Sequence, residues 1–92
     1  MIRSFADEET RQLYLKGRSR KFGSIAKAAT RKIQAVDFAV TPEDLKNPPG
    51  NHLEKLHGDR EGHYSIRVND QYRVCFRWEG RDAWDVELVD YH

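Results

Sequence analysis

The chain has 92 residues, of which 34% are charged and 38% hydrophobic, and its formal net charge is +1. No apolar run approaches the about 20 residues that a membrane-spanning helix needs, and the start, MIRSFADEET, lacks the apolar region of a signal peptide. The one cysteine, Cys75, excludes an internal disulfide and a cysteine-based zinc site. We therefore expect a single domain over residues 1–92 that acts in the reducing cytoplasm, without membrane association.

The charge is unevenly distributed along the chain. Residues 1–37 hold nine Lys and Arg against four Asp and Glu, a net charge of +5, whereas residues 79–92 hold one against five, a net charge of −4. The basic part can attract a polyanion such as nucleic acid. The alternative is that these residues form solvated helix faces, and the charge distribution alone supports both interpretations equally.

The first half of the chain predicts two helices. Residues 1–5 fit a short strand, and residues 6–17 fit a helix because acids in the first turn suit the helix dipole and Gly17 can end it. After a basic connection over residues 18–23, Ser24 is expected to cap a second helix. Three-and-four spacing gives that helix one apolar stripe, formed by Ile25, Ala28, Ala29, Ile33 and Val36, with Lys27, Arg31 and Lys32 off it.

The second half predicts strands. TPEDL fits one helical turn capped by Thr41, and KNPPGN breaks the chain. Alternation then predicts strands over residues 63–68, 72–78 and 84–89, each with one apolar side, including Trp78 and Trp84 in the core. We therefore expect an α+β fold, with two N-terminal helices packed on a mainly antiparallel β-sheet of about four to five strands.

The polar side of these strands carries the candidate functional residues. Alternation places Arg67, Arg73, Arg77 and Tyr91 on one sheet face, with His57 and Arg60 in the loop leading to it. Arg67 and Arg77 favour ordinary ion pairs with acids on the neighbouring strand, Asp85 and Glu87. Arg73 lies mid-strand, where we expect it to reach an open concave surface. The histidines at positions 52, 57 and 63 match no common metal-ligand spacing, so we expect no metal site.

These residue types suit RNA cleavage without a metal. That reaction needs a base for the 2′-hydroxyl, a cation for the developing phosphorane and an acid for the leaving 5′-oxygen. Histidine suits the proton transfers, and arginine offers phosphate a permanent fork of donors. The set of His92, Tyr91, His57, Arg73 and Arg60 contains all three kinds of group.

Two segments, KLHGDREGHYSIRVNDQYRVCFRW and the ending VELVDYH, together with PPGN and TPEDL upstream, resemble the HigB toxins of the RelE superfamily over essentially the whole chain. The resemblance implies a RelE-like microdomain and a ribosome-dependent mRNA endonuclease without a cofactor, which cuts mRNA in the A site of the 70S ribosome. It also implies a HigA-type helix-turn-helix antitoxin as partner and operator DNA bound through the toxin–antitoxin complex.

The resemblance also implies roles for individual residues. Arg73 matches the strand arginine that contacts the scissile phosphate, and Asp90, Tyr91 and His92 match the C-terminal functional trio. His57 stands where the family often has lysine. The candidates for further RNA phosphate contacts are Arg60, Lys55 and Arg67.

Three other functions remain open at this level. They are a non-catalytic RNA-binding module, a RelE-like gyrase inhibitor and a structural adaptor whose arginines pair with acids. The ending DYH argues against the gyrase inhibitor, because that role does not require proton-transfer groups.

Overall fold

A computed structural model describes residues 1–91, so the expectations for His92 lie outside the described residues. Two helices, α1 (Glu8–Lys16) and α2 (Ala26–Phe38), precede a four-stranded antiparallel sheet in the order β1-β2-β3-β4. The strands are β1 (Glu54–Lys55), β2 (His63–Arg67), β3 (Tyr72–Glu79) and β4 (Asp82–Asp90). Short 3₁₀ turns connect these elements: η1 (Gly23–Ile25), η2 (Pro42–Lys46), η3 (Pro49–Asn51) and η4 (Gly58–Arg60). The predicted α+β class, with helices before an antiparallel sheet, is confirmed.

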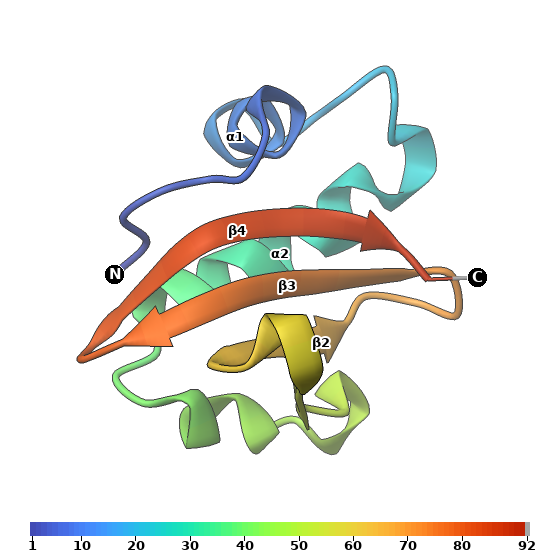
Figure 1. Cartoon of the computed structure of the whole chain (residues 1–92). Helices are drawn as coiled ribbons and strands as arrows, with labels where there is room; N and C mark the ends of the chain where they lie inside the picture. Colours follow the sequence, from blue (N-terminus) through green and yellow to red (C-terminus); the bar gives the residue numbers. More distant parts are fainter. Residues whose placement is uncertain (92) are drawn as a thin grey trace.

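The helices cover one side of the sheet. α2 lies behind β3 and β4, and α1 lies beside β4 (Figure 1). Ala29, Ile33 and Val36 of α2 are fully buried against Val74 and Phe76 of the sheet, in one core cluster. Ala28 of the predicted stripe is exposed instead, and Ala26 is buried in its place. No helix within residues 1–91 is long and apolar enough to cross a membrane.

The ends of α1 follow the prediction, whereas the start of α2 does not. Asp7 caps α1 by accepting a hydrogen bond from the Thr10 N–H at 2.6 Å, and Gly17 ends it with a left-handed φ of 70°. Ser24 is not a helix cap, because η1 leads directly into α2 with Ile25 at the N-cap position in a helical conformation. A capping serine needs extended backbone, which the chain does not adopt there.

The N-terminal segment forms two isolated parallel bridges to β4 in place of the expected regular strand. Ile2 pairs with Ala83 and Phe5 with Val86. The Asp37 carboxylate on α2 accepts hydrogen bonds from the Ile2 N–H at 2.7 Å and the Tyr14 hydroxyl at 2.9 Å. This carboxylate therefore ties the N-terminus and both helices together.

A β-bulge in β4 changes the predicted alternation. The register with β3 shifts between Cys75 and Arg77, and Asp85 has a left-handed φ of 54°. Consequently Ala83, Val86 and Leu88 are the buried residues of β4, and Trp84 pairs with Arg77, which lies 5.5 Å from the centre of its ring. The prediction that Trp84 lies in the core is wrong, because strict alternation does not allow for the extra residue of a bulge. Trp78 packs on the core as expected.

Candidate active site

The second face of the sheet is covered at its centre. Ser65, Arg73 and Cys75 are 0%, 8% and 1% exposed. Figure 1 shows η4 in front of β2, on the side of the sheet opposite α2. The expectation of an open surface around Arg73 is therefore wrong, because the segment before β2 folds back over this face.

Arg73 is held by a set of neutral acceptors and one carboxylate. Its Nε donates to the Ser65 hydroxyl at 2.8 Å, and its Nη2 donates to the backbone oxygens of Ser65, at 3.2 Å, and of His52. His52 turns its carbonyl toward this group from a left-handed conformation with a φ of 43°. The Nη1 lies 3.5 Å from Oε1 of Glu54 on β1. These contacts fix the plane of the guanidinium.

Tyr91 directly follows β4 and lies beside Cys75, on the same sheet face as Arg73. Its backbone N–H donates to the Gln71 oxygen at 2.6 Å, and its hydroxyl lies 3.9 Å from Sγ of Cys75. Burial raises the pKa of the Tyr91 hydroxyl above its ordinary value and Cys75 adds to the rise, whereas Arg60 and Arg73 oppose it. The hydroxyl is therefore neutral at physiological pH and can donate a hydrogen bond.

Arg60 and Cys75 complete this cluster. Burial raises the pKa of the Cys75 thiol, and the charges of Arg60 and Arg73 counteract only part of the rise. Cys75 is therefore a protonated, buried strand residue, as the sequence indicates. Arg60, from η4, lies 3.7 Å from the Glu87 carboxylate of β4 and is half exposed. The structure thus brings Arg60, Arg73 and Tyr91 around Cys75, and we call these four residues the arginine–tyrosine cluster.

The other strand arginines are paired with acids. Arg67 lies opposite Arg73 in the ladder, on the predicted face, but its partner is Asp70 in the turn and not Asp85 or Glu87. Arg77 pairs with Glu79 and, at 3.5 Å, with Asp85, so its expected cross-strand ion pair is confirmed. Both side chains fit the interpretation of a solvated, charge-paired sheet surface.

The remaining candidates are dispersed. His57 is exposed and directly precedes η4. Lys55 lies opposite Tyr64, which stacks on Phe76 of the core, and Asp90 lies opposite Tyr72. Lys55 and Asp90 therefore belong to the α2 side of the sheet, whereas the arginine–tyrosine cluster lies on the other side. Within residues 1–91, no group of three His, Cys, Asp or Glu side chains could hold a metal ion.

The sequence pattern does not reveal Glu54 or the His52 carbonyl as part of this site. A two-residue strand has too few positions to show an alternation, and a carbonyl contact leaves no side-chain signal. The pairing of Glu54 with Ser65 places this carboxylate on the Arg73 face.

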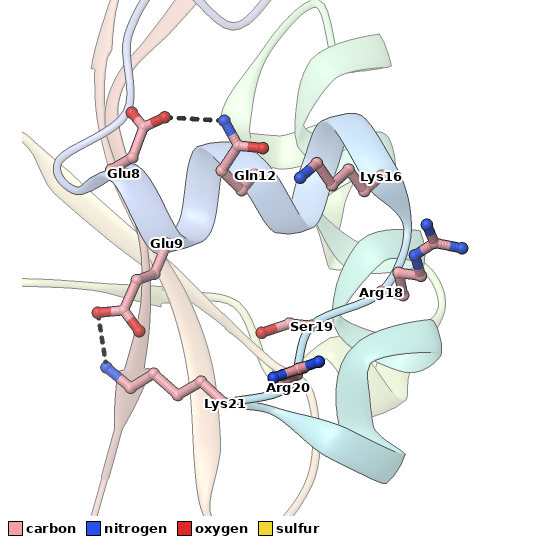
Figure 2. A pocket seen from close by; sticks show the side chains of 8 residues that line it. All are labelled: Glu8, Glu9, Gln12, Lys16, Arg18, Ser19, Arg20 and Lys21. Carbon is pink, nitrogen blue, oxygen red and sulfur yellow. Dashed lines mark hydrogen bonds and ion pairs between the residues drawn. The ribbon is translucent and has the colours of Figure 1, made fainter.

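A second feature lies on α1, outside the arginine–tyrosine cluster. An open groove of about 710 Å³ lies between α1 and residues 18–21, and Figure 2 shows the side chains that line it. Glu9 pairs with Lys21 at 3.0 Å, and Gln12 donates to Glu8 at 2.8 Å. The groove is lined by Glu8, Glu9, Gln12, Lys16, Arg18, Ser19, Arg20 and Lys21, so cations outnumber acids.

Similarity to known proteins identifies the family. Toxin HigB-1 of Vibrio cholerae is 40% identical over 80 residues, which cover 85% of this chain and 84% of that protein. Endoribonuclease HigB of Proteus vulgaris is 35% identical over the full length of both chains.

Solved structures confirm the fold. The YoeB–YefM complex from Staphylococcus aureus matches with a TM-score of 0.62 and 15% identity, covering 100% of this chain and 98% of that one. A YafQ mutant from E. coli matches with a TM-score of 0.66 and 8% identity, covering 98% of this chain and 93% of that one.

Residues 3–92 match the family described as the RelE-like toxin of type II toxin–antitoxin system HigB. The chain therefore belongs to the HigB-like family of RelE-like toxins, whose partner is an antitoxin.

Proposed function

We propose that this protein, an endoribonuclease toxin by its family, cuts mRNA in the A site of the ribosome and so stops translation. The arginine–tyrosine cluster is the observation that carries this proposal. It combines the guanidinium groups of Arg73 and Arg60 with the neutral Tyr91 hydroxyl on one sheet face. Guanidinium donors suit a phosphate whose charge grows during the reaction.

The proposed reaction is attack of a 2′-hydroxyl on the adjacent phosphate, which forms a 2′,3′-cyclic phosphate and breaks the bond from phosphorus to the 5′-oxygen of the next nucleotide. A base takes the proton of the 2′-hydroxyl, and an acid gives a proton to the leaving 5′-oxygen. Arg73 and Arg60 would stabilise the phosphorane, and Tyr91 would donate a hydrogen bond or stack on a base. His57 and His92 would transfer protons, because a neutral imidazole nitrogen can accept a proton and a protonated imidazole can donate one. Asp90 would act next to His92, while Lys55 and Arg67 would contact RNA phosphates farther from the reacting atoms.

The arginine–tyrosine cluster can stabilise charge on the phosphate, but the reaction also requires the 2′-oxygen in line with the scissile bond. An mRNA held by the ribosome can meet that requirement, so cleavage depends on the ribosome in this proposal. The groove beside α1 supports the proposal, because Arg18 and Arg20 border it and cations favour contact with an RNA backbone.

The proposed partners and setting are those of a HigB toxin. The antitoxin would be HigA-type, with a helix-turn-helix that carries the complex to operator DNA. We propose that residues 1–92 act as one toxin domain, in the cytoplasm where ribosomes translate.

Purified protein tests this function directly. The same mRNA is offered free and on translating ribosomes, and cleavage is read by primer extension. We expect cuts on ribosomes, little cleavage of free RNA, and none with Arg73→Ala. Arg81→Ala, which removes a cation in the β3–β4 turn, is the matched control and should cut normally. RNA binding with steep salt dependence and no products would instead support a non-catalytic RNA-binding module.

A further inference from the structure

The Nη1 nitrogen of Arg73 contacts a different kind of group from the Nε and Nη2 nitrogens. Nε and Nη2 donate to Ser65 and to the His52 carbonyl, which are neutral acceptors. Nη1 instead faces the charged carboxylate of Glu54 at 3.5 Å. The Arg73 side chain is 10% exposed and the Glu54 side chain 56% exposed, so Glu54 lies on the solvent side of the pair.

This arrangement leaves an incoming anion one approach to Arg73. The donors on Nε and Nη2 are occupied by groups that the fold holds in place, since Ser65 is fully buried within β2. The Nη1 nitrogen instead makes an ion pair with a half-exposed side chain on a two-residue edge strand. A phosphate that binds Arg73 must therefore approach Nη1 next to the Glu54 carboxylate, and it must move that carboxylate aside because two anions at one guanidinium nitrogen repel each other.

We propose that Glu54 is a positioning residue that occupies the phosphate-binding Nη1 nitrogen of Arg73 and must be displaced by the RNA. This inference rests on the proposed role of Arg73. Glu54 then makes the site selective for ribosome-bound mRNA over free RNA. A mobile phosphate of free RNA competes poorly with a carboxylate tethered 3.5 Å away, whereas a phosphate that the ribosome holds in place can displace it.

Glu54→Gln tests the displacement. The amide oxygen keeps an acceptor for Nη1 and removes the competing charge. With ribosome-bound mRNA, we expect the KM for Glu54→Gln to fall about two- to fivefold, the range expected for a half-exposed ion pair, and kcat to stay unchanged. Cleavage of free RNA should rise, and the difference from wild type should shrink at high salt because the competing interaction is screened.

Glu61→Gln is the matched control, because it makes the same change of charge at an exposed residue between η4 and β2. Binding is also measured with ribosomes whose mRNA carries a 2′-deoxy nucleotide at the cut position. In an Arg73→Ala background, Glu54→Gln should leave this binding unchanged, since its effect acts through Arg73.

The outcomes separate the two proposals. If Arg73→Ala still cuts, the proposed active site itself is wrong. If Arg73→Ala is inactive and Glu54→Gln behaves like Glu61→Gln, the role of Glu54 is wrong. A loss of kcat in Glu54→Gln would also overturn it, because the carboxylate would then transfer a proton in the reaction.

Discussion

At the scale of single residues, Asp85 decides which side chains of β4 face the core. Its left-handed backbone moves Val86 into phase with Ala83, and its side chain lies 3.3 Å from the Ser4 hydroxyl, which in turn accepts the Asp85 N–H at 2.8 Å. The sequence could not show this bulge, because Trp84, Val86 and Leu88 give an unbroken alternation. Because strict alternation does not include this bulge, it places Trp84 wrongly in the core, whereas it predicts Val86 and Leu88 correctly.

Substitutions at Asp85 should follow the tolerance of each residue for a left-handed conformation. Asp85→Ala should lower the free energy of unfolding by about 1–2 kcal/mol, through backbone strain and the lost contacts with Ser4 and Arg77. Asp85→Asn should change it by less than about 0.5 kcal/mol, because asparagine accepts this conformation and keeps an acceptor. Urea denaturation measures both, and equal losses would mean that backbone conformation is not the cause.

Cys75 and Tyr91 should make the protein less stable in alkali. Burial raises the pKa of both groups in the folded state, so the unfolded chain loses these protons at lower pH than the folded one. Their contribution is complete below the unfolded cysteine pKa of about 8.5 and is lost as pH rises above it.

Cys75→Ala isolates the thiol's share of this effect. Between about pH 8.5 and 9.5, urea midpoints of the wild type should fall more than those of Cys75→Ala. Parallel curves for the two proteins would contradict the assigned burial effect.

At the scale of elements, α1 is attached to the sheet by a buried threonine. Thr10 is fully buried, and its hydroxyl accepts the Leu88 N–H of β4 at 3.1 Å. The hydroxyl therefore satisfies a backbone donor on the edge of the sheet, beyond the two bridges that the N-terminal segment makes to Ala83 and Val86 of β4. The helix pattern of residues 6–17 predicted α1 itself, but no periodicity distinguishes this threonine from a surface residue.

Thr10→Val should be costly although the two side chains have the same shape. It leaves the buried Leu88 N–H without its acceptor, which should lower the free energy of unfolding by about 1–3 kcal/mol. Thr30→Val is the control, because the Thr30 hydroxyl only donates to the Ala26 oxygen within α2, at 2.7 Å. Chemical denaturation compares them, and similar losses would refute the special role of Thr10.

The elements that the sequence predicted are those with several turns or alternating positions. Both helices, β2, β3 and most of β4 follow from periodicity, and Thr41 caps η2 as expected. β1 and η4 are too short to leave such a pattern. β1 nevertheless extends the sheet beside β2, and η4 lies over the second sheet face, which explains why the sequence predicts an open surface around Arg73.

At the scale of the whole molecule, the sheet is covered on both sides for different reasons. α2 packs on an apolar face to form the core, whereas η4 lies over a polar face where Arg73, Ser65 and Cys75 are buried together. The candidate residues on this face were found through the chemistry of their types and the resemblance to HigB toxins. Alternation predicts that Arg67, Arg73, Arg77 and Tyr91 share this face, whereas the side of Lys55 depends on the pairing of the two-residue β1, which is too short to show an alternation.

The central claim is that this face, with the C-terminal residues that follow β4, cuts translated mRNA. The most direct test is brief induction in bacterial cells of the wild type, Arg73→Ala, the chain lacking His92, and the Arg81→Ala control, with growth and primer extension on a reporter mRNA. We predict growth arrest and cuts within translated codons for the wild type and Arg81→Ala only. Cuts by the Arg73→Ala protein, or no cuts by a folded wild type, would contradict the account.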